Sequence, residues 1–195
     1  MKRAFDVVVA AVGLVVLSPA LAVISVAVVL DGRRPVLFRQ ERVGRHGKIF
    51  RIHKFRTMAP GQNGLLVSTS DDVRVTRVGR ILRQYKLDEL PQLVDVLRGD
   101  MSLVGPRPEV PRYVDLWPAN ERDVILSVRP GITDPASIAF RHEGKLLAAE
   151  ADPHVAYVSQ ILPRKTAIYV DYVRNRSFVE DLRIIGRTVV SVTRS

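Results

Sequence analysis

The residues best suited to chemistry in this 195-residue chain are two adjacent carboxylates, Asp88 and Glu89, in the stretch Leu87-Asp88-Glu89-Leu90-Pro91. Proline is tolerated in the first turn of a helix but not in its interior, so both acids are expected at or before a helix N-terminus. Acidic side chains at that position commonly cap a helix and favour its dipole. The alternative is a carboxylate pair that holds a divalent metal while one member attacks phosphorus. Adjacent residues cannot point the same way on a regular helix, which predicts two different roles.

A second candidate is the arginine in Gly105-Pro106-Arg107-Pro108. The two prolines fix the backbone on both sides of Arg107, and Pro108 also restricts Arg107 to extended conformations. A guanidinium held on a stiff backbone suits a phosphate or a planar base. A rigid turn that carries a solvated arginine explains the same residues, and the motif alone leaves both interpretations open.

A strongly basic segment follows residue 33 and ends near Met58, and only Glu41 opposes its positive charges. Gly44-Arg45-His46-Gly47 predicts a turn between two strands. Lys54 and Arg56, expected on one strand face, are suited to a diphosphate. The alternative is a solvated strand attracted to anionic lipid. The four histidines have no metal-ligand spacing, and the sequence contains neither a Walker A motif nor GxGxxG.

The elements that must position these residues begin with an apolar run from Val7 to Leu30, preceded by Lys2-Arg3. As a helix this run is about 36 Å long at ~1.5 Å per residue, enough to cross the hydrocarbon core. It can be a cleaved signal peptide, a single span, or a helix that bends at Ser18-Pro19 and returns to the same face. Proline in mid-run and positive charge at both ends favour re-entry.

The rest of the chain is expected to be mainly helical, and it contains no second run long and apolar enough to span a membrane. The apolar spacing of the last helix fits either a helix that faces the core or a basic amphipathic helix on a membrane surface. The other expected elements are a loop over Ala59–Ser70, a charged helix over Asp71–Tyr85, a short helix over Leu90–Leu97 stopped by Gly99, a proline-rich connector over Met101–Pro111, a loop with Arg129-Pro130-Gly131 and Asp134-Pro135, and two closing helices over Pro163–Val173 and Phe178–Val192.

Composition narrows the possible partners. The net charge is +10, from 30 Lys and Arg against 20 Asp and Glu, which indicates an anionic partner. The absence of cysteine excludes disulfides, thiol catalysis and cysteine metal sites. A non-enzymatic module that uses the basic segment on a membrane surface or a nucleic acid explains the charge and the apolar run. It does not explain an arginine clamped between prolines or a carboxylate pair before a helix.

Taken in their order along the chain, these segments resemble the bacterial sugar transferase family, the monotopic phosphoglycosyl transferases. The size of the chain resembles the minimal form of that family. The match extends from Lys2 to about Ile185, and its most specific part is the long stretch from Leu87 to Pro108. The motifs are Lys2-Arg3-x-Phe5-Asp6, Ser18-Pro19, Lys54-Phe55-Arg56-Thr57-Met58, Leu87-Asp88-Glu89-Leu90-Pro91-Gln92-Leu93, Arg98 to Pro108, Arg129-Pro130-Gly131-Ile132-Thr133 and Asn175-x-Ser177-Phe178-x-x-Asp181-Leu182.

The resemblance implies an α+β fold with two parts. Residues 1–32 would form a re-entrant membrane helix broken at Ser18-Pro19. Residues 33–195 would form a mainly helical cytosolic catalytic domain with a small β-hairpin and amphipathic interfacial helices. The implied reaction moves a sugar phosphate from a UDP-sugar to polyprenol (undecaprenyl) phosphate at the cytoplasmic face of the bacterial inner membrane. UMP is released, and the product begins glycoconjugate or polysaccharide synthesis.

The resemblance also implies roles for single residues. Asp88 would be the nucleophile that carries the phosphosugar, and Glu89 would support the metal or position the phosphate. Both acids are expected to hold Mg²⁺. The expected substrate-binding residues are Lys54 and Arg83 for phosphates, Arg107 with Pro106 and Pro108 for uridine, and Arg56 and Arg129.

The implied partners are a UDP-sugar, polyprenol phosphate and inner-leaflet lipid, and nucleic acid is not expected. The identity of the sugar, the glycan pathway and a homo-oligomeric state stay open. One segment departs from the family pattern: Asp134-Pro135-Ala136-Ser137 stands where many relatives have Gly-(Leu or Trp)-Ala-Gln. The carboxylate pair and Pro106-Arg107-Pro108 are intact, but what the resemblance implies about sugar selection by this segment stays open. A transferase that releases UDP is a further alternative, which the identity of the released nucleotide decides.

Overall fold

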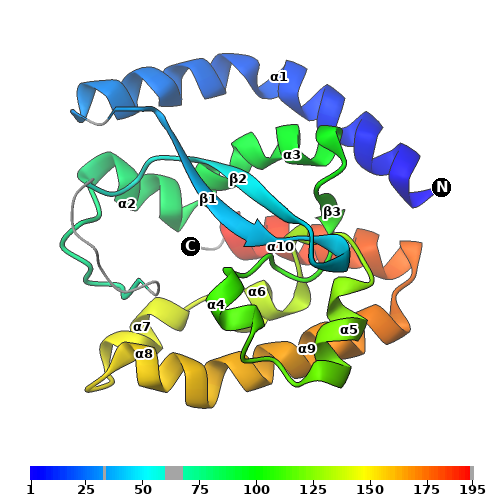
Figure 1. Cartoon of the computed structure of the whole chain (residues 1–195). Coiled ribbons are helices and arrows are strands. Elements are labelled where there is room, and N and C mark those ends of the chain that lie inside the picture. Colours follow the sequence, from blue (N-terminus) through cyan, green and yellow to red (C-terminus); the bar gives the residue numbers. More distant parts are fainter. Residues whose placement is uncertain (33, 60–67, 194–195) are drawn as a thin grey trace.

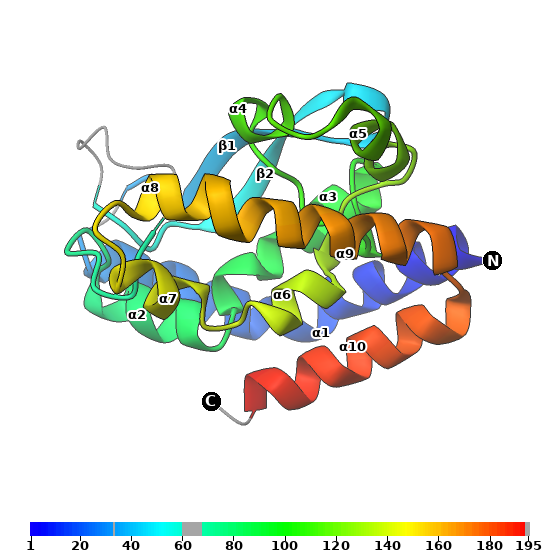
Figure 2. The same cartoon turned by 90° about the horizontal axis from the view of Figure 1, so that it is seen from below.

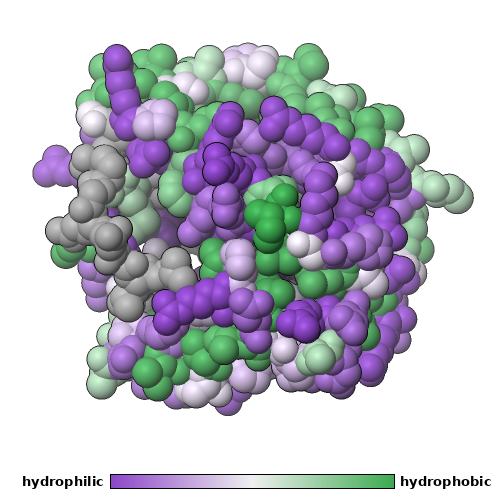
Figure 3. Space-filling model, viewed as in Figure 1, coloured by the Kyte–Doolittle hydropathy of each residue, from purple (hydrophilic) through white to green (hydrophobic). Residues whose placement is uncertain are grey.

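The apolar N-terminal run forms one helix, α1 (Lys2–Leu30), in the computed structural model, which describes residues 1–32, 34–59 and 68–193. By length and composition α1 can cross a membrane, and only 6% of its most apolar stretch is buried in the protein. It follows one edge of the molecule, where hydrophobic surface is visible (Figures 1 and 3). This confirms the predicted apolar helix.

Pro19 lies inside α1, and the helix continues across it. The predicted break at Ser18-Pro19 is therefore not an interruption of the helix, whose ribbon curves along its length (Figure 1). Pro19 has no N–H to donate to the carbonyl of Val15, four residues earlier. Ser18 Oγ donates to that carbonyl at 2.8 Å. The serine thus replaces the donor that proline lacks, which matters where no water is present to do so.

The predicted hairpin is confirmed. Strands β1 (Leu37–Val43) and β2 (Ile49–Phe55) pair antiparallel, with Leu37 opposite Phe55 and Val43 opposite Ile49. The 3-10 turn η1 (Arg45–Gly47) joins them. His46 and Gly47 take the positive φ angles of +58° and +77° that this tight turn requires.

The next helix is shorter than expected. Helix α2 runs over Arg77–Gln84, because Thr76 caps its start by accepting a hydrogen bond from Gly79 N at 2.9 Å. The prediction that the helix begins at Asp71 is therefore wrong by six residues. Most of the loop expected over Ala59–Ser70 lies outside the described residues.

Two short helices follow and carry the carboxylate pair. A 3-10 helix, η2 (Leu87–Gln92), leads directly into α3 (Leu93–Arg98). Gly99 ends α3 with φ +89°, which confirms the predicted stop. The expected helix start at Leu90 is corrected, since residues 87–92 form the tighter 3-10 turn.

A second sheet was not expected. Strands β3 (Ser102–Val104) and β4 (Gly131–Thr133) pair in parallel, with Ser102 opposite Gly131 and Val104 opposite Thr133. The predictions of a connector over Met101–Pro111 and of a loop at Arg129-Pro130-Gly131 are wrong at these strands. Gly105 and Gly131 permit the pairing, because a Cβ added to Gly131 would lie 2.1 Å from Gly105 N.

Helices make up most of the remaining chain, which confirms a mainly helical α+β fold. The predicted closing helices are present, with Pro163 in the first turn of α9. Figure 2 shows α10 running back in the direction opposite to α9. The elements are α4 (Pro111–Val114), α5 (Ala119–Leu126), α6 (Pro135–Ala139), α7 (Glu143–Ala148), α8 (Pro153–Ala156), the π-turn η3 (Tyr157–Ile161), α9 (Leu162–Asn175) and α10 (Phe178–Thr193).

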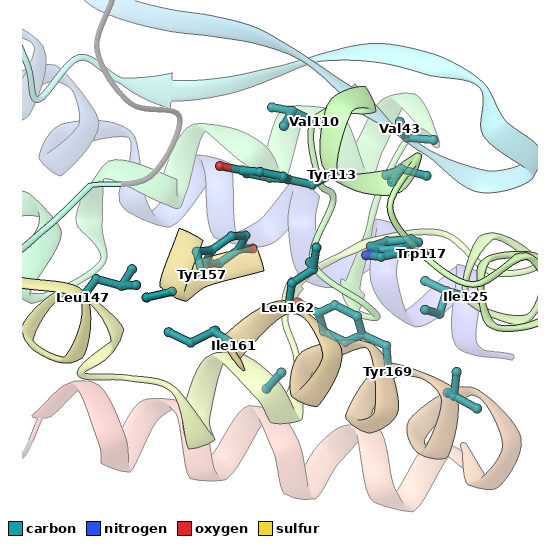
Figure 4. Packing of buried hydrophobic residues seen from close by; sticks show 14 residues of the cluster. Val43, Val110, Tyr113, Trp117, Ile125, Leu147, Tyr157, Ile161, Leu162 and Tyr169 are labelled. Carbon is teal, nitrogen blue, oxygen red and sulfur yellow. The ribbon is translucent and has the colours of Figure 1, made fainter. Parts of the chain in front are cut away.

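Two of the three hydrophobic clusters among the described residues are large and hold most of these elements together. One is rich in aromatic rings and packs α4 and α5 against η3 and α9, with Tyr113, Trp117, Tyr157 and Tyr169 at its centre (Figure 4). The other contains Ala10 of α1 with residues of β2, α3, β3 and α10. The side of α1 that carries Ala10 therefore belongs to the hydrophobic core, and the rest of the helix is open.

The apolar stripe of α10 is only partly open. Phe178, Leu182 and Val189 are 40%, 43% and 57% exposed, while Ile185 of the same stripe packs against the hydrophobic core. The interpretation that the stripe faces the core is therefore wrong for these three residues and right for Ile185. That the open part lies on a membrane surface stays a prediction.

The first turn of α1 is fastened by polar contacts. Lys2 Nζ lies 2.6 Å from Asp181 Oδ2 of α10 and donates to the carbonyl of Val104 at 3.1 Å. Asp6 is buried and accepts hydrogen bonds from Ser102 Oγ at 2.8 Å and from Leu103 N at 3.4 Å. Residues at one end of the chain thus join β3 and α10 into one unit with α1.

Candidate active site

The carboxylate pair lies in the 3-10 helix η2, between the hairpin and α3. Lys86 precedes it in the left-handed region, with φ +53°, and turns the chain sharply after α2. Asp88 is 9% exposed and Glu89 is 6% exposed. Because a 3-10 helix has about three residues per turn, neighbouring side chains diverge. The structure therefore gives the two acids different surroundings.

Glu89 is held by two cations. Lys54 Nζ of β2 donates to Glu89 Oε1 at 2.7 Å, and the guanidinium of Arg107 donates to both carboxylate oxygens. Burial raises the pKa of Glu89, but the charges of Arg107 and Lys54 outweigh it and keep the pKa well below its usual value. Glu89 is therefore a permanent anion whose oxygens are largely occupied.

Asp88 is in the opposite situation. It accepts no hydrogen bond from any residue in the described part of the chain, although Lys54, Arg83 and Arg107 are close enough to act on it by charge. Burial and the negative charge of Glu89 raise the pKa of Asp88 against those cations. A desolvated carboxylate whose oxygens are not engaged by hydrogen-bond donors can act as a nucleophile.

The second sheet positions Arg107. Gly105 N donates to Thr133 O at 3.1 Å, and Pro106 O accepts from Gly131 N at 3.0 Å. Just beyond, Pro108 O accepts from Arg42 Nη1 at 3.1 Å. The prolines predicted to stiffen this segment therefore also present their carbonyl groups to neighbouring chain segments, and the guanidinium is directed at Glu89.

A buried pair behind the site positions Lys54. Its neighbour His53 places Nδ1 2.6 Å from Asp95 Oδ1 of α3, and His53 N donates to Asp95 Oδ2 at 3.0 Å. This double contact joins β2 to α3 directly beside the η2 helix. Burial lowers the pKa of Lys54 to about 8, although Glu89 acts in the opposite direction.

Arg42 is a site residue that sequence reasoning did not single out. It is partly buried on β1 and lies 3.6 Å from Glu109 Oε2, and Glu109 also accepts from Tyr157 Oη at 2.9 Å. The sequence shows Arg42 only as one of several arginines in the hairpin. Its partner Glu109 is 67 residues away in the sequence, and no local sequence pattern predicts that contact.

The remaining predicted site residues lie in three different places. Arg83, in the last turn of α2, faces the carboxylate pair and acts on Asp88 by charge. Arg56 donates to Pro35 O at 2.8 Å and lies over the Phe38 ring, without a contact to Asp88 or Glu89. Arg129 donates to Gly99 O at 2.8 Å, at the far end of α3.

The donor set is compatible with Mg²⁺. No group of three or more His, Cys, Asp or Glu side chains suited to a metal occurs in the described ranges. Mg²⁺ commonly binds through one or two carboxylates and completes its shell with water and substrate phosphate. Asp88 offers both oxygens, whereas Lys54 and Arg107 leave Glu89 little remaining acceptor capacity.

Replacing Glu89 tests whether this carboxylate holds the two cations together. Glu89→Gln leaves Lys54 and Arg107 facing each other without a counter-charge, and the thermal unfolding midpoint in detergent should fall by about 5–10 °C. The control is Glu180→Gln, which removes the partner of the exposed Arg183 and should cost little. Equal shifts for the two variants would show that Glu89 does not have this role.

Comparisons with known proteins match this arrangement to one family. The family model described as bacterial sugar transferase matches residues 1–195. The chain is 40% identical to the UDP-glucose:undecaprenyl-phosphate glucose-1-phosphate transferase of Caulobacter vibrioides, over 98% of this chain and 69% of that protein. It is 34% identical to a UDP-N-acetylgalactosamine-undecaprenyl-phosphate N-acetylgalactosaminephosphotransferase of Aeromonas hydrophila, over 98% of this chain but 43% of that protein. An uncharacterized sugar transferase of Bacillus subtilis is 38% identical, over 98% of this chain and 87% of its own length.

Proposed function

The chain belongs to the bacterial sugar transferase family, and from this we propose that it transfers a sugar phosphate from a UDP-sugar to undecaprenyl phosphate and releases UMP. The names of the Caulobacter and Aeromonas relatives state transfer to undecaprenyl phosphate, with glucose in one and N-acetylgalactosamine in the other. Because these sugars differ, the proposal leaves the sugar open.

The observation that most directly supports the proposal is that Asp88 and Glu89 are adjacent but have different hydrogen-bond partners. Glu89 is engaged by Lys54 and Arg107, and Asp88 accepts no hydrogen bond from the described residues. A pair that only capped a helix would have no reason to direct two cations at one carboxylate. We assign Asp88 as the nucleophile and Glu89 as the residue that positions the cations.

The first step forms a bond from a carboxylate oxygen of Asp88 to the phosphorus that bears the sugar. The bond from that phosphorus to the bridging oxygen breaks, and UMP leaves with the electron pair. An anion attacking an anion needs positive charge nearby, which Lys54, Arg83 and Arg107 provide. When bound, Mg²⁺ would be held chiefly by Asp88, because the oxygens of Glu89 are engaged by Lys54 and Arg107, and it would supply further charge neutralisation for the phosphates.

In the second step, a phosphate oxygen of undecaprenyl phosphate attacks the same phosphorus. The bond to Asp88 breaks, its carboxylate is restored, and a polyprenyl diphosphate sugar is formed. The hydrocarbon of this acceptor stays in the bilayer, so its phosphate must meet Asp88 at the membrane surface. The open apolar faces of α1 and α10 are consistent with a molecule seated at that surface.

For the membrane, the proposal is that α1 enters from the cytoplasmic side of the inner membrane and returns to it, with residues 33–195 as the catalytic domain in the cytoplasm. The proline in the middle of the apolar run and the cations at both ends support this placement. The chain has no cysteine, so single introduced cysteines can be labelled without background.

Ala4→Cys and Arg34→Cys should therefore both react with an impermeant maleimide added from the cytoplasmic side of inverted vesicles. Neither should react in intact spheroplasts until the membrane is permeabilised. If one position is labelled from each side, α1 is a simple span and the re-entrant placement is wrong.

Turnover itself is tested with purified protein, Mg²⁺, undecaprenyl phosphate and a panel of UDP-sugars. At least one UDP-sugar should yield UMP, and addition of EDTA should stop its release. If no UDP-sugar yields UMP, or if UDP is released instead, the proposed reaction is wrong.

A further inference from the structure

A cavity at the first turn of α1 is separate from the carboxylate pair. Its volume is about 240 Å³, and five cations but only one acid line it: Lys2, Arg3, Arg45, Arg129, Arg176 and Asp6. Neither Lys54, Glu89 nor Arg107 contributes to it. Helix α3 lies between the two places, since η2 leads into its start and Gly99 follows its end.

The charges of two lining residues are already engaged. Lys2 is paired with Asp181, and Asp6 accepts hydrogen bonds from Ser102 and Leu103. The four arginines are different. In the part of the chain that the structure describes, none of them has a carboxylate within ion-pair distance.

Each arginine is instead held by backbone carbonyls. Arg45 Nε donates to Ser127 O at 3.0 Å, Arg129 Nε to Gly99 O at 2.8 Å, and Arg176 Nη1 to Val173 O at 3.1 Å. Arg3 uses Nη1 and Nη2 for the carbonyls of Val96 and Leu97. A guanidinium has five N–H donors, and Arg45 and Arg129, which line the cavity, use only Nε in hydrogen bonds among the described residues, so their terminal nitrogens can still donate.

We propose that this cavity is a second anion site, which holds a phosphate group by its arginines. Backbone anchoring without neutralisation orients several guanidinium groups around one space, which suits tetrahedral phosphate oxygens. The four arginines that line the cavity come from the N-terminal helix, the hairpin turn, the segment before β4 and the end of α9. A bound phosphate lowers the repulsion among them and fastens α1 to the catalytic fold.

The phosphate can come from two sources. Three lining residues, Lys2, Arg3 and Asp6, lie in the same turn of α1 as Phe5, whose ring is in edge contact with that of Phe178 on the apolar face of α10, with centroids 5.2 Å apart. A phospholipid whose chains lie against that face would place its headgroup near the cavity. A soluble phosphate from the cytoplasm meets the same donors.

The test compares thermal unfolding of the full-length protein in neutral detergent, with saturating UMP to occupy the carboxylate site. Two probes are used: inorganic phosphate against chloride at equal ionic strength, and micelles doped with phosphatidylglycerol against phosphatidylcholine. The variant is Arg45→Gln/Arg176→Gln. Its matched control is Arg164→Gln/Arg174→Gln, which removes the same charge from exposed positions of α9 outside the cavity.

At least one probe should raise the unfolding midpoint of the parent and of the control by several degrees, and this rise should be lost in the cavity variant. A response to phosphatidylglycerol alone identifies a headgroup, and a response to inorganic phosphate alone identifies a soluble ion. The general salt effect of phosphate acts equally on all variants. If neither probe acts, or if the cavity variant responds like the control, the site does not exist.

If the double variant does not unfold cooperatively, Arg45→Lys and Arg45→Gln replace it. Arg45 is exposed and lies in the hairpin turn, so both should fold. The lysine variant should keep most of the shift and the glutamine variant should lose a large part of it. Equal shifts for these two variants would likewise overturn the proposal. This outcome leaves the proposed transferase reaction unaffected, because UMP release is measured separately.

Discussion

Asp88→Asn is expected to abolish UMP release, by a factor of at least about 10³, with little change in folding. The amide keeps the size of the side chain but cannot form the bond to phosphorus that both steps require. The side chain is buried, with 9% exposed, but it accepts no hydrogen bond from the described residues. Its replacement by an amide of the same size therefore removes no polar contact that holds the fold. An ordinary helix cap would instead lose about 1 kcal/mol of stability and keep its activity.

The matched control is Asp100→Asn, which changes a carboxylate paired with the exposed Lys48 outside the site. It should turn over at the rate of the parent. Incubation of the parent with a radiolabelled UDP-sugar, without acceptor, should leave label on one peptide that contains Asp88. Label on Glu89, or a fully active Asp88→Asn variant, would show that the nucleophile has been assigned wrongly.

Gly131→Ala should destabilise the fold more than Glu89→Gln does. Its Cβ would lie 2.1 Å from Gly105 N and 2.5 Å from Gly105 O, both backbone atoms that cannot rotate away. Strands β3 and β4 would have to separate, and with them the segment that directs Arg107 at Glu89. We expect the unfolding midpoint to fall by about 10 °C or more, and UMP release to fall with it.

Gly186→Ala is the control, for which the unfolding midpoint should change in the opposite direction. Gly186 lies inside α10, and a Cβ there would meet nothing within 4 Å among the described atoms. Alanine favours the helix by about 1 kcal/mol, so the midpoint should rise by about 2–4 °C. If both variants behave alike, the parallel sheet does not depend on close contact between the two glycines.

Local signals were sufficient where glycine or proline marks a turn or a helix end. Gly44 to Gly47 predicts the hairpin turn, Gly99 the end of α3, and Pro163 the start of α9. The start of α2 was missed, because charged residues before Thr76 resemble a helix in composition and only the cap defines where it begins.

Features that depend on distant partners could not be predicted. The spacing of Phe178, Leu182 and Val189 is the same whether that face is buried or open, so the sequence left the orientation of α10 undecided. The pairing of β3 with β4 joins strands of three residues each, too short for an alternating pattern. The Asp88-Glu89 pair was evident, but which acid is engaged by cations depends on Lys54 and Arg107.

The contacts at Lys2 and Asp6 have a consequence for how such a protein meets its lipid substrate. Because the first turn of α1 is tied to β3 and α10, this end of the anchor cannot rotate independently of the rest of the described fold. The position of α1 in the bilayer then sets the distance of Asp88 from the membrane surface. A thinner or thicker hydrocarbon layer tilts the whole body, and the gap between Asp88 and the acceptor phosphate changes with it. We therefore expect turnover to change with the chain length of the surrounding lipid, without any ligand.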